Sequence, residues 1–121
     1  NIYNYSKKIS IDKKIFNILV VFTGSHLDNL NMIKTLNSFS KIICNKLNFT
    51  LRFHKNSEIN KVIPFIDKKI KFKISKNELI FKLLQNSRCV ICRPGTISLE
   101  AAIFNVPTIL TRRIFGIFAV K

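Results

Sequence analysis

Acidic side chains are scarce in this sequence. The 121 residues hold 6 Asp and Glu against 21 Lys and Arg, which gives a formal net charge of +15 at pH 7. A positive excess of this size suggests nucleic acid or an anionic membrane surface as a partner. A second explanation stays open, because the lysines are scattered and the chain is rich in Ile, Asn and Phe but poor in Ala and Gly. An AT-rich coding bias produces that composition in any fold, and on this view nucleic acid is not the expected partner.

Cysteines are few, and a long apolar run is absent. The three cysteines are an odd number, and the N-terminus has no signal-peptide pattern. Both features favour a reducing compartment. No apolar run approaches the roughly 20 residues of a membrane span. We therefore expect a soluble cytoplasmic domain, and a peripheral contact with the inner face of the plasma membrane stays open.

The length fits a single domain with one sizeable core. The chain begins with Asn1 and not with Met, and it ends abruptly at Lys121, so we expect a fragment or a processed chain. Residues 1–14 are polar and basic and are expected to be a lead segment. Residues 15–121 are expected to form the domain.

Short apolar runs alternate with segments of helical periodicity from end to end. The run at 15–22 is rich in β-branched and aromatic residues. In the segment 26–48, apolar residues recur at spacings of three and four. Strands are predicted at 15–22, 49–54, 70–75, 88–92 and 106–111, and helices at 26–48, from Leu79 onward and at 97–105; residues 61–69, which contain Pro64, stay unassigned. This alternation predicts an α/β, Rossmann-like open parallel sheet with helices on both faces.

Two sequence patterns resemble capping boxes, in which a hydroxyl and an acid three residues later satisfy free N–H groups at the start of a helix. Ser25 and Asp28 form the first pattern, and Ser75 and Glu78 form the second. We therefore expect helices to begin after both serines.

A glycine follows the first predicted strand in "FTGS" and the fourth in "RPGT". In an open parallel sheet, ligands bind beyond the carboxyl ends of the strands, near the point where the strand order reverses. Each glycine turn leads into a helix N-terminus, where free N–H groups and the helix dipole favour a phosphate. Neither turn has the spacing of GxGxxG or of a P-loop, and a glycine in such a turn also has a purely structural explanation.

Glu100 is an acid in a helix that is otherwise almost wholly apolar. An ionised group at the edge of a core needs a partner. A structural salt bridge to Arg93, Arg112 or Arg113 would supply one. Alternatively, the carboxylate accepts hydrogen bonds from ligand hydroxyls, as an acid does for a ribose in nucleotide-binding folds.

The other reactive side chains suggest no metal or catalytic group. Cys89 and Cys92 have CxxC spacing, but residues i and i+3 of a strand point to opposite faces, so both are expected to be core cysteines. His26 is expected to be a solvated loop residue, although it follows a glycine turn, and His54 has no companion ligand in the sequence. No Ser/His/Asp arrangement or pair of carboxylates is visible, so catalytic residues stay unknown.

The stretch "GTISLEAAIFNVPTIL" resembles the nucleotide-sugar-binding motif in the C-terminal domain of GT-B glycosyltransferases. There a glycine turn leads to a helix with a Glu, and a Pro begins the next strand. The spacing of Gly95, Glu100 and Pro107 is similar to that of lipid-A-disaccharide synthase. "CRPG" and "VVFTGS" also resemble the peptidoglycan N-acetylglucosaminyltransferase, with a turn one residue shorter and fewer glycines.

The resemblance implies the donor-binding half of an inverting enzyme that transfers a hexosyl group from a UDP-sugar to a lipid-linked or glycan acceptor. It implies no metal or cofactor, because helix N-termini and basic side chains offset the charge of the leaving diphosphate. It also implies an incomplete enzyme, since the acceptor domain and the usual catalytic base are missing. That domain or subunit would be a partner. The implied roles are ribose binding by Glu100, diphosphate binding by Gly24, Ser25, Gly95, Thr96 and Ser98, base recognition near Ile74, and donor-sugar contact by Arg112.

A different class of function stays open beside this one. The chain could be a basic Rossmann-like module without catalysis that binds nucleic acid or a partner subunit. Nucleic-acid binding would weaken steeply with salt, whereas binding in a UDP pocket would not.

Overall fold

Five parallel strands form one sheet in the computed structural model, which describes residues 15–55, 57–76 and 78–111. The strand order is β3-β2-β1-β4-β5. The strands are β1 (Phe16–Val21), β2 (Leu47–Arg52), β3 (Phe72–Ser75), β4 (Cys89–Cys92) and β5 (Thr108–Leu110). Every pairing is parallel, and Ile18 of β1 lies between Phe49 of β2 and Cys89 of β4. The predicted α/β class with an open parallel sheet is confirmed.

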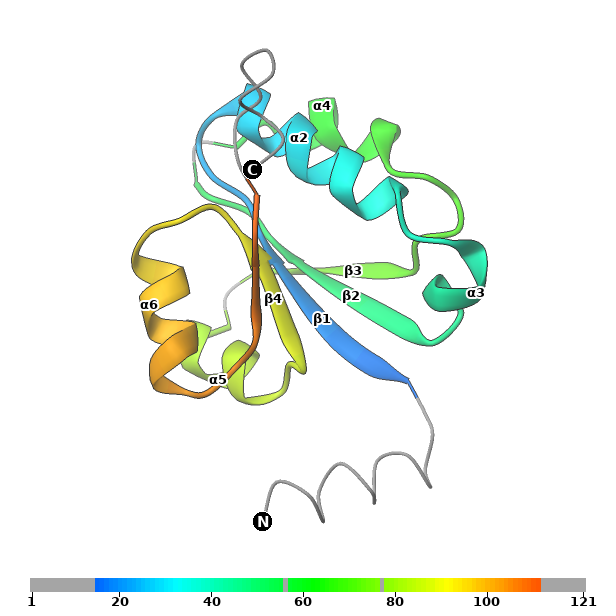
Figure 1. Cartoon of the computed structure of the whole chain (residues 1–121). Coiled ribbons are helices and arrows are strands. Elements are labelled where there is room, and N and C mark those ends of the chain that lie inside the picture. The colour runs from blue at the N-terminus through cyan, green and yellow to red at the C-terminus, as the bar shows by residue number, and fades with distance from the viewer. Residues whose placement is uncertain (1–14, 56, 77, 112–121) are drawn as a thin grey trace, which may run out of the picture.

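Helices cover both faces of this sheet (Figure 1). One side is covered by α2 (His26–Asn37), α3 (Lys41–Cys44), α4 (Ile59–Val62) and the short 3-10 helix η1 (Ile63–Phe65). The other side is covered by α5 (Ile80–Gln85) and α6 (Thr96–Ile103). In the part of the chain that the structure describes, no helix is long and apolar enough to cross a membrane.

The two faces of the sheet belong to two separate apolar clusters. Ile18 and Val20 of β1 pack with Met32 and Leu36 of α2. Leu19, between them in sequence, packs in the second cluster with Leu84. Successive side chains of a strand point to opposite faces, so a central parallel strand covered on both sides must be apolar at every position. This requirement explains the apolar run at 18–22, whereas Asn17 lies near the exposed amino end of β1.

The single helix predicted over 26–48 is wrong. The segment instead contains α2, a break around Ser38, the short α3, and the first residues of β2. The break has a local cause, because the Ser38 hydroxyl donates to the Thr35 carbonyl at 2.6 Å and the Ser40 hydroxyl accepts from the Ile43 amide at 3.2 Å. Serine bonds of this kind compete with continuation of a helix. The apolar spacing runs through the break, which is why periodicity alone did not reveal it.

One of the two predicted capping boxes is present in part. The Ser25 hydroxyl accepts from the Asp28 amide at 3.4 Å, so Ser25 is the N-cap of α2. The prediction for Ser75 and Glu78 is wrong, because Ser75 is the buried last residue of β3 and α5 begins after Leu79 without a side-chain cap. At the start of α6, one of the two hydrogen bonds of a capping box is present. The Ser98 hydroxyl accepts from the amide of the N-cap residue Gly95 at 3.0 Å.

Candidate functional site

A cavity of about 470 Å³ lies at the carboxyl ends of β1, β2 and β4. It occupies the place where the strand order reverses, since β1 has β2 on one side and β4 on the other. Ligands of open parallel sheets bind at such a point. The cavity is lined by Val21, Phe22, Thr23, Arg52, Phe53, His54, Lys55, Cys92, Arg93, Pro94, Gly95, Thr96 and Ile97.

The lining is cationic. Arg52, Lys55 and Arg93 line the cavity, and neither Asp nor Glu is among the lining residues that the structure describes. Arg52 is oriented by a 2.6 Å hydrogen bond from its Nη1 to the carbonyl of Glu78, which uses one of its five N–H donors. The first turn of α6 adds the positive end of a helix dipole at Gly95 and Thr96. Together these groups give the cavity a positive character.

An apolar wall completes the cavity. The rings of Phe22 and Phe53 stack with centroids 4.5 Å apart and planes 5° from parallel. Phe22 is buried and Phe53 is half-buried, and Val21 and Ile97 line the cavity beside them. A flat aromatic surface next to cationic groups suits a ligand that joins a planar ring to a phosphate.

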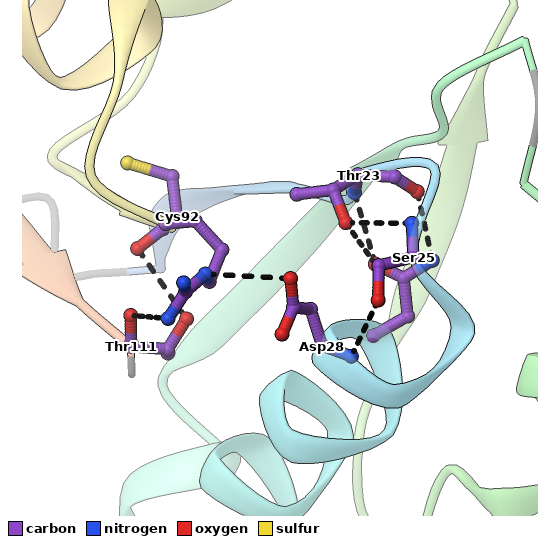
Figure 2. A network of polar contacts seen from close by, with 7 residues as sticks. Thr23, Ser25, Asp28, Cys92 and Thr111 are labelled. Atoms are coloured by element: carbon purple, nitrogen blue, oxygen red, sulfur yellow. Dashed lines mark hydrogen bonds and ion pairs between the residues drawn. The ribbon is translucent and has the colours of Figure 1, made fainter. Parts of the chain in front are cut away.

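Arg93 is fixed in place by contacts with two other parts of the chain. Its Nε lies 3.5 Å from the Asp28 carboxylate of α2, and its Nη1 donates to the Thr111 carbonyl at 3.0 Å. The Asp28 side chain is 8% exposed and that of Arg93 is 27% exposed. Figure 2 shows Asp28 on the helix and Cys92 and Thr111 at the two strand ends. The ion pair therefore joins α2 to β4 and β5 at the edge of the cavity.

The turn after β1 is held by Asn29, which is fully buried on the apolar face of α2. Asn29 Oδ1 accepts from the Thr23 amide at 2.9 Å, and Asn29 Nδ2 donates to the Thr23 carbonyl at 2.9 Å. The Ser57 hydroxyl donates to the same carbonyl at 2.6 Å. The sequence analysis missed Asn29, although an amide on an apolar stripe three residues before Met32 was a visible signal.

The predicted phosphate-binding residues are only partly brought together. Gly95 and Thr96 line the cavity. Gly24 and Ser25 follow the lining residue Thr23 directly, and the Ser25 hydroxyl is used as the cap of α2. Ser98 is in the first turn of α6 but does not line the cavity, and its hydroxyl bonds the backbone of Gly95.

The remaining predicted site residues lie away from this cavity or outside the description. Ile74 is in the edge strand β3 and Glu100 is one turn further along α6, and neither is a lining residue. Of the three arginines proposed as salt-bridge partners of Glu100, Arg93 pairs with Asp28 instead. Arg112 and Arg113 lie outside the described residues.

Of the two cysteines predicted to be in the core, Cys92 is buried and Cys89 is half-buried. Cys89 packs against the first apolar cluster and Cys92 belongs to the second, so the two side chains point to opposite faces of β4. Burial, together with the neighbouring Cys89, raises the pKa of Cys92 to about 11. Burial also raises the pKa of Cys89. Among the described residues, no three His, Cys, Asp or Glu side chains are grouped so that they could hold a metal ion.

The two histidines occupy different environments. His26 is exposed, as predicted, but it is the first residue of α2 and not a loop residue. His54 is exposed as well, but it lines the cavity after the end of β2. Its position beside Lys55 adds a side chain that can donate or accept a hydrogen bond there.

Comparison with known proteins does not support the glycosyltransferase resemblance. No family model matches the chain, and no curated protein matches it. Among solved structures, a universal stress protein in complex with cAMP aligns over 84% of this chain and 100% of its own, at 9% identity and a TM-score of 0.46.

The predicted membership of the GT-B glycosyltransferases is therefore wrong. A strand, a glycine turn, a helix and a proline before the next strand recur in parallel α/β sheets for structural reasons, so the motif that suggested the family has a structural explanation. The α/β class does not depend on this resemblance, because the parallel sheet of the chain shows it directly.

Proposed function

We propose that this chain is a Rossmann-like module that binds a nucleotide or a related phosphate ester in the cavity at the carboxyl ends of β1, β2 and β4. The main support is the lining, in which Arg52 and Lys55 supply positive charge beside Arg93, whose charge is shared with Asp28 at the edge of the cavity. The N-terminus of α6 favours a phosphate at Gly95 and Thr96. The stacked Phe53 ring offers a surface for a base.

A UDP-sugar belongs to this ligand class and is retained as one candidate ligand. The predicted transfer of its sugar stays a prediction. The proposal assigns a binding function, and it differs from the alternative of a module that binds nucleic acid or a partner subunit in its ligand.

Isothermal titration calorimetry with AMP, ADP, UDP, a UDP-sugar, adenosine, uridine and inorganic phosphate tests the proposal. At least one nucleotide should bind more tightly than both its nucleoside and inorganic phosphate, because only the nucleotide contacts both parts of the cavity. Lys55→Gln should weaken binding of that nucleotide about 3- to 10-fold, as expected for loss of a charge-assisted hydrogen bond at a partly exposed site.

Lys34→Gln is the matched control, since Lys34 is exposed near the end of α2 and does not line the cavity. If both variants weaken binding equally, the effect is one of net charge and the proposed site is wrong. Equal affinity for a nucleotide and its nucleoside would also overturn it.

The variant Glu100→Ala distinguishes binding in the cavity from the ribose-binding role predicted for Glu100. The ribose-binding role predicts a loss on the order of 1–3 kcal/mol. Binding within the cavity alone predicts no loss, because Glu100 is not a lining residue.

A further inference from the structure

Helix α6 is apolar on its solvent side as well as on its core side. Ala101 is fully buried in the second cluster, and Ile97 and Phe104 pack against that cluster. On the opposite side of the helix, Leu99 is 68% exposed and Ile103 is 76% exposed. A helix that is apolar all round is normally buried on all sides. Helix α6 therefore exposes a face that the described part of the chain does not cover.

This exposed face continues onto α5. Leu99 and Ile103 are one turn apart on α6, and Phe104 follows Ile103 directly. The ring centroid of Phe104 lies 5.8 Å from that of Phe81, which is 49% exposed on α5. Leu99, Ile103, Phe104 and Phe81 therefore form one apolar patch, the α5–α6 patch, and none of them lines the cavity proposed to bind a nucleotide. Single exposed apolar residues are normal on a protein surface, whereas a contiguous patch marks an interaction site.

The coding bias that could explain the charge does not explain this patch. AT-rich codons supply Ile, but they also supply Lys and Asn. The α6 segment Thr96–Ile103, "TISLEAAI", contains neither Lys nor Asn. On the other side of the sheet, Ile42 of α3 is exposed too, but the exposed Lys41 precedes it directly. The apolar solvent side of α6 is therefore a feature of this helix in particular.

Lysines lie on the same side of the sheet as the α5–α6 patch. Lys82 follows Phe81 on α5 and is exposed. Lys73 of β3 is the register partner of Thr50, which is the partner of Leu19, and Leu19 packs in the second cluster beneath α5 and α6. Residues in register share a face of the sheet, so the exposed Lys73 points to this side as well. Edge protection explains Lys73 but not Lys82, which is on a helix.

An anionic membrane surface fits this combination better than a second copy of the chain. Membrane-binding surfaces insert apolar side chains at the boundary between headgroups and acyl chains, and nearby cations attract anionic lipids. A second copy would bring together two chains of net charge +15, which repel each other. We propose that the α5–α6 patch docks on an anionic lipid bilayer. The patch enters the acyl boundary, and Lys73 and Lys82 face the lipid headgroups.

Sedimentation with sucrose-loaded vesicles tests the proposal in the whole chain. The wild type should bind phosphatidylcholine vesicles with 30% phosphatidylserine about five-fold or more tightly than vesicles of phosphatidylcholine alone. Leu99→Ser/Ile103→Ser should lower binding to the anionic vesicles roughly ten-fold or more, because each CH₂ group buried among lipids contributes about four-fold. Leu27→Ser/Ile42→Ser removes two exposed apolar residues from the other side of the sheet and should leave binding almost unchanged.

Charge variants test the lysines in the same assay. Lys73→Gln/Lys82→Gln should lower binding to the anionic vesicles about ten-fold or more, since each lysine near such a surface contributes about five-fold. Lys34→Gln/Lys41→Gln removes the same charge from α2 and α3, on the other side of the sheet. It should lower binding several-fold less, because salt screens charges that are distant from the lipid. A circular dichroism melt confirms that each variant is folded before binding is compared.

Three results would overturn the proposal. The first is a wild-type chain that binds neither kind of vesicle, and the second is an equal loss in a variant pair and its control. The third is a wild-type dimer in sedimentation velocity that Leu99→Ser/Ile103→Ser dissociates while vesicle binding stays unchanged, since the patch would then bind a second copy.

Discussion

The ion pair between Asp28 and Arg93 should have a measurable coupling energy, because it is the polar link between α2 and the ends of β4 and β5. We consider Asp28→Asn, Arg93→Gln and the double variant. Asparagine and glutamine preserve much of the side-chain volume and remove one charge each. The cycle therefore isolates the interaction between the two side chains.

The distance and the burial set the magnitude. At an effective dielectric constant of about 20, two unit charges 3.5 Å apart attract by roughly 5 kcal/mol. Desolvation offsets much of this attraction, and Arg93, with 27% of its side chain exposed, still contacts solvent. We expect a coupling of about 1–2 kcal/mol. Arg93→Gln should cost more than Asp28→Asn, because the remaining Asp28 carboxylate is only 8% exposed whereas the remaining guanidinium can reach water.

Urea unfolding followed by circular dichroism, with linear extrapolation, gives the four free energies of unfolding. The coupling should decrease only modestly between low and moderate salt, since buried pairs are screened less than exposed ones. A coupling below about 0.3 kcal/mol, the usual limit of additivity, would show that the pair does not fix Arg93. An equal cost for the two single variants would contradict the inferred difference in burial.

Two further predictions concern the core. Leu84→Ala should lower the free energy of unfolding by about 2–5 kcal/mol, because Leu84 is fully buried in the second cluster. Leu99 is 68% exposed on α6, so Leu99→Ala should change the free energy of unfolding by less than about 0.5 kcal/mol. Similar costs of the two substitutions in urea unfolding would mean that this cluster is poorly packed. In the folded protein the pKa of Cys92 is about 11, above its ordinary value of 9.0. The free energy of unfolding, relative to that of Cys92→Ala, should therefore be unaffected below about pH 9 and fall by about 2–3 kcal/mol as the pH rises to about 11. Parallel pH profiles for the two proteins would contradict this.

The elements that the sequence predicts well are those with local causes. Strand β1 follows from an apolar run that is broken only by Asn17, and the cap at Ser25 follows from a hydroxyl three residues before Asp28. The opposed faces of Cys89 and Cys92 follow from the twofold alternation of a strand. The same reasoning failed at residues 38–47, where helical spacing continues by coincidence into β2.

The candidate site was only partly predictable. Gly95 and Thr96 were identified from a glycine turn after a strand, and they line the cavity. Glu100 was selected because an acid in an apolar helix is unusual, yet it does not line the cavity. Its apparent partner Arg93 pairs with a residue 65 positions earlier in the chain, at a distance that no local pattern encodes.

The sequence by itself determined a parallel α/β fold, an anion-favouring turn before α6 and a strong positive charge, because each depends on composition or on neighbours within a few residues. Only the tertiary structure decided which side chains meet. The strand order β3-β2-β1-β4-β5 brings Arg52, Arg93 and Phe53 around one cavity and leaves Lys71, Phe72 and Lys73 on an edge. Hydrophobic periodicity specifies which face of a strand is buried, but strand order arises from packing between segments far apart in the chain.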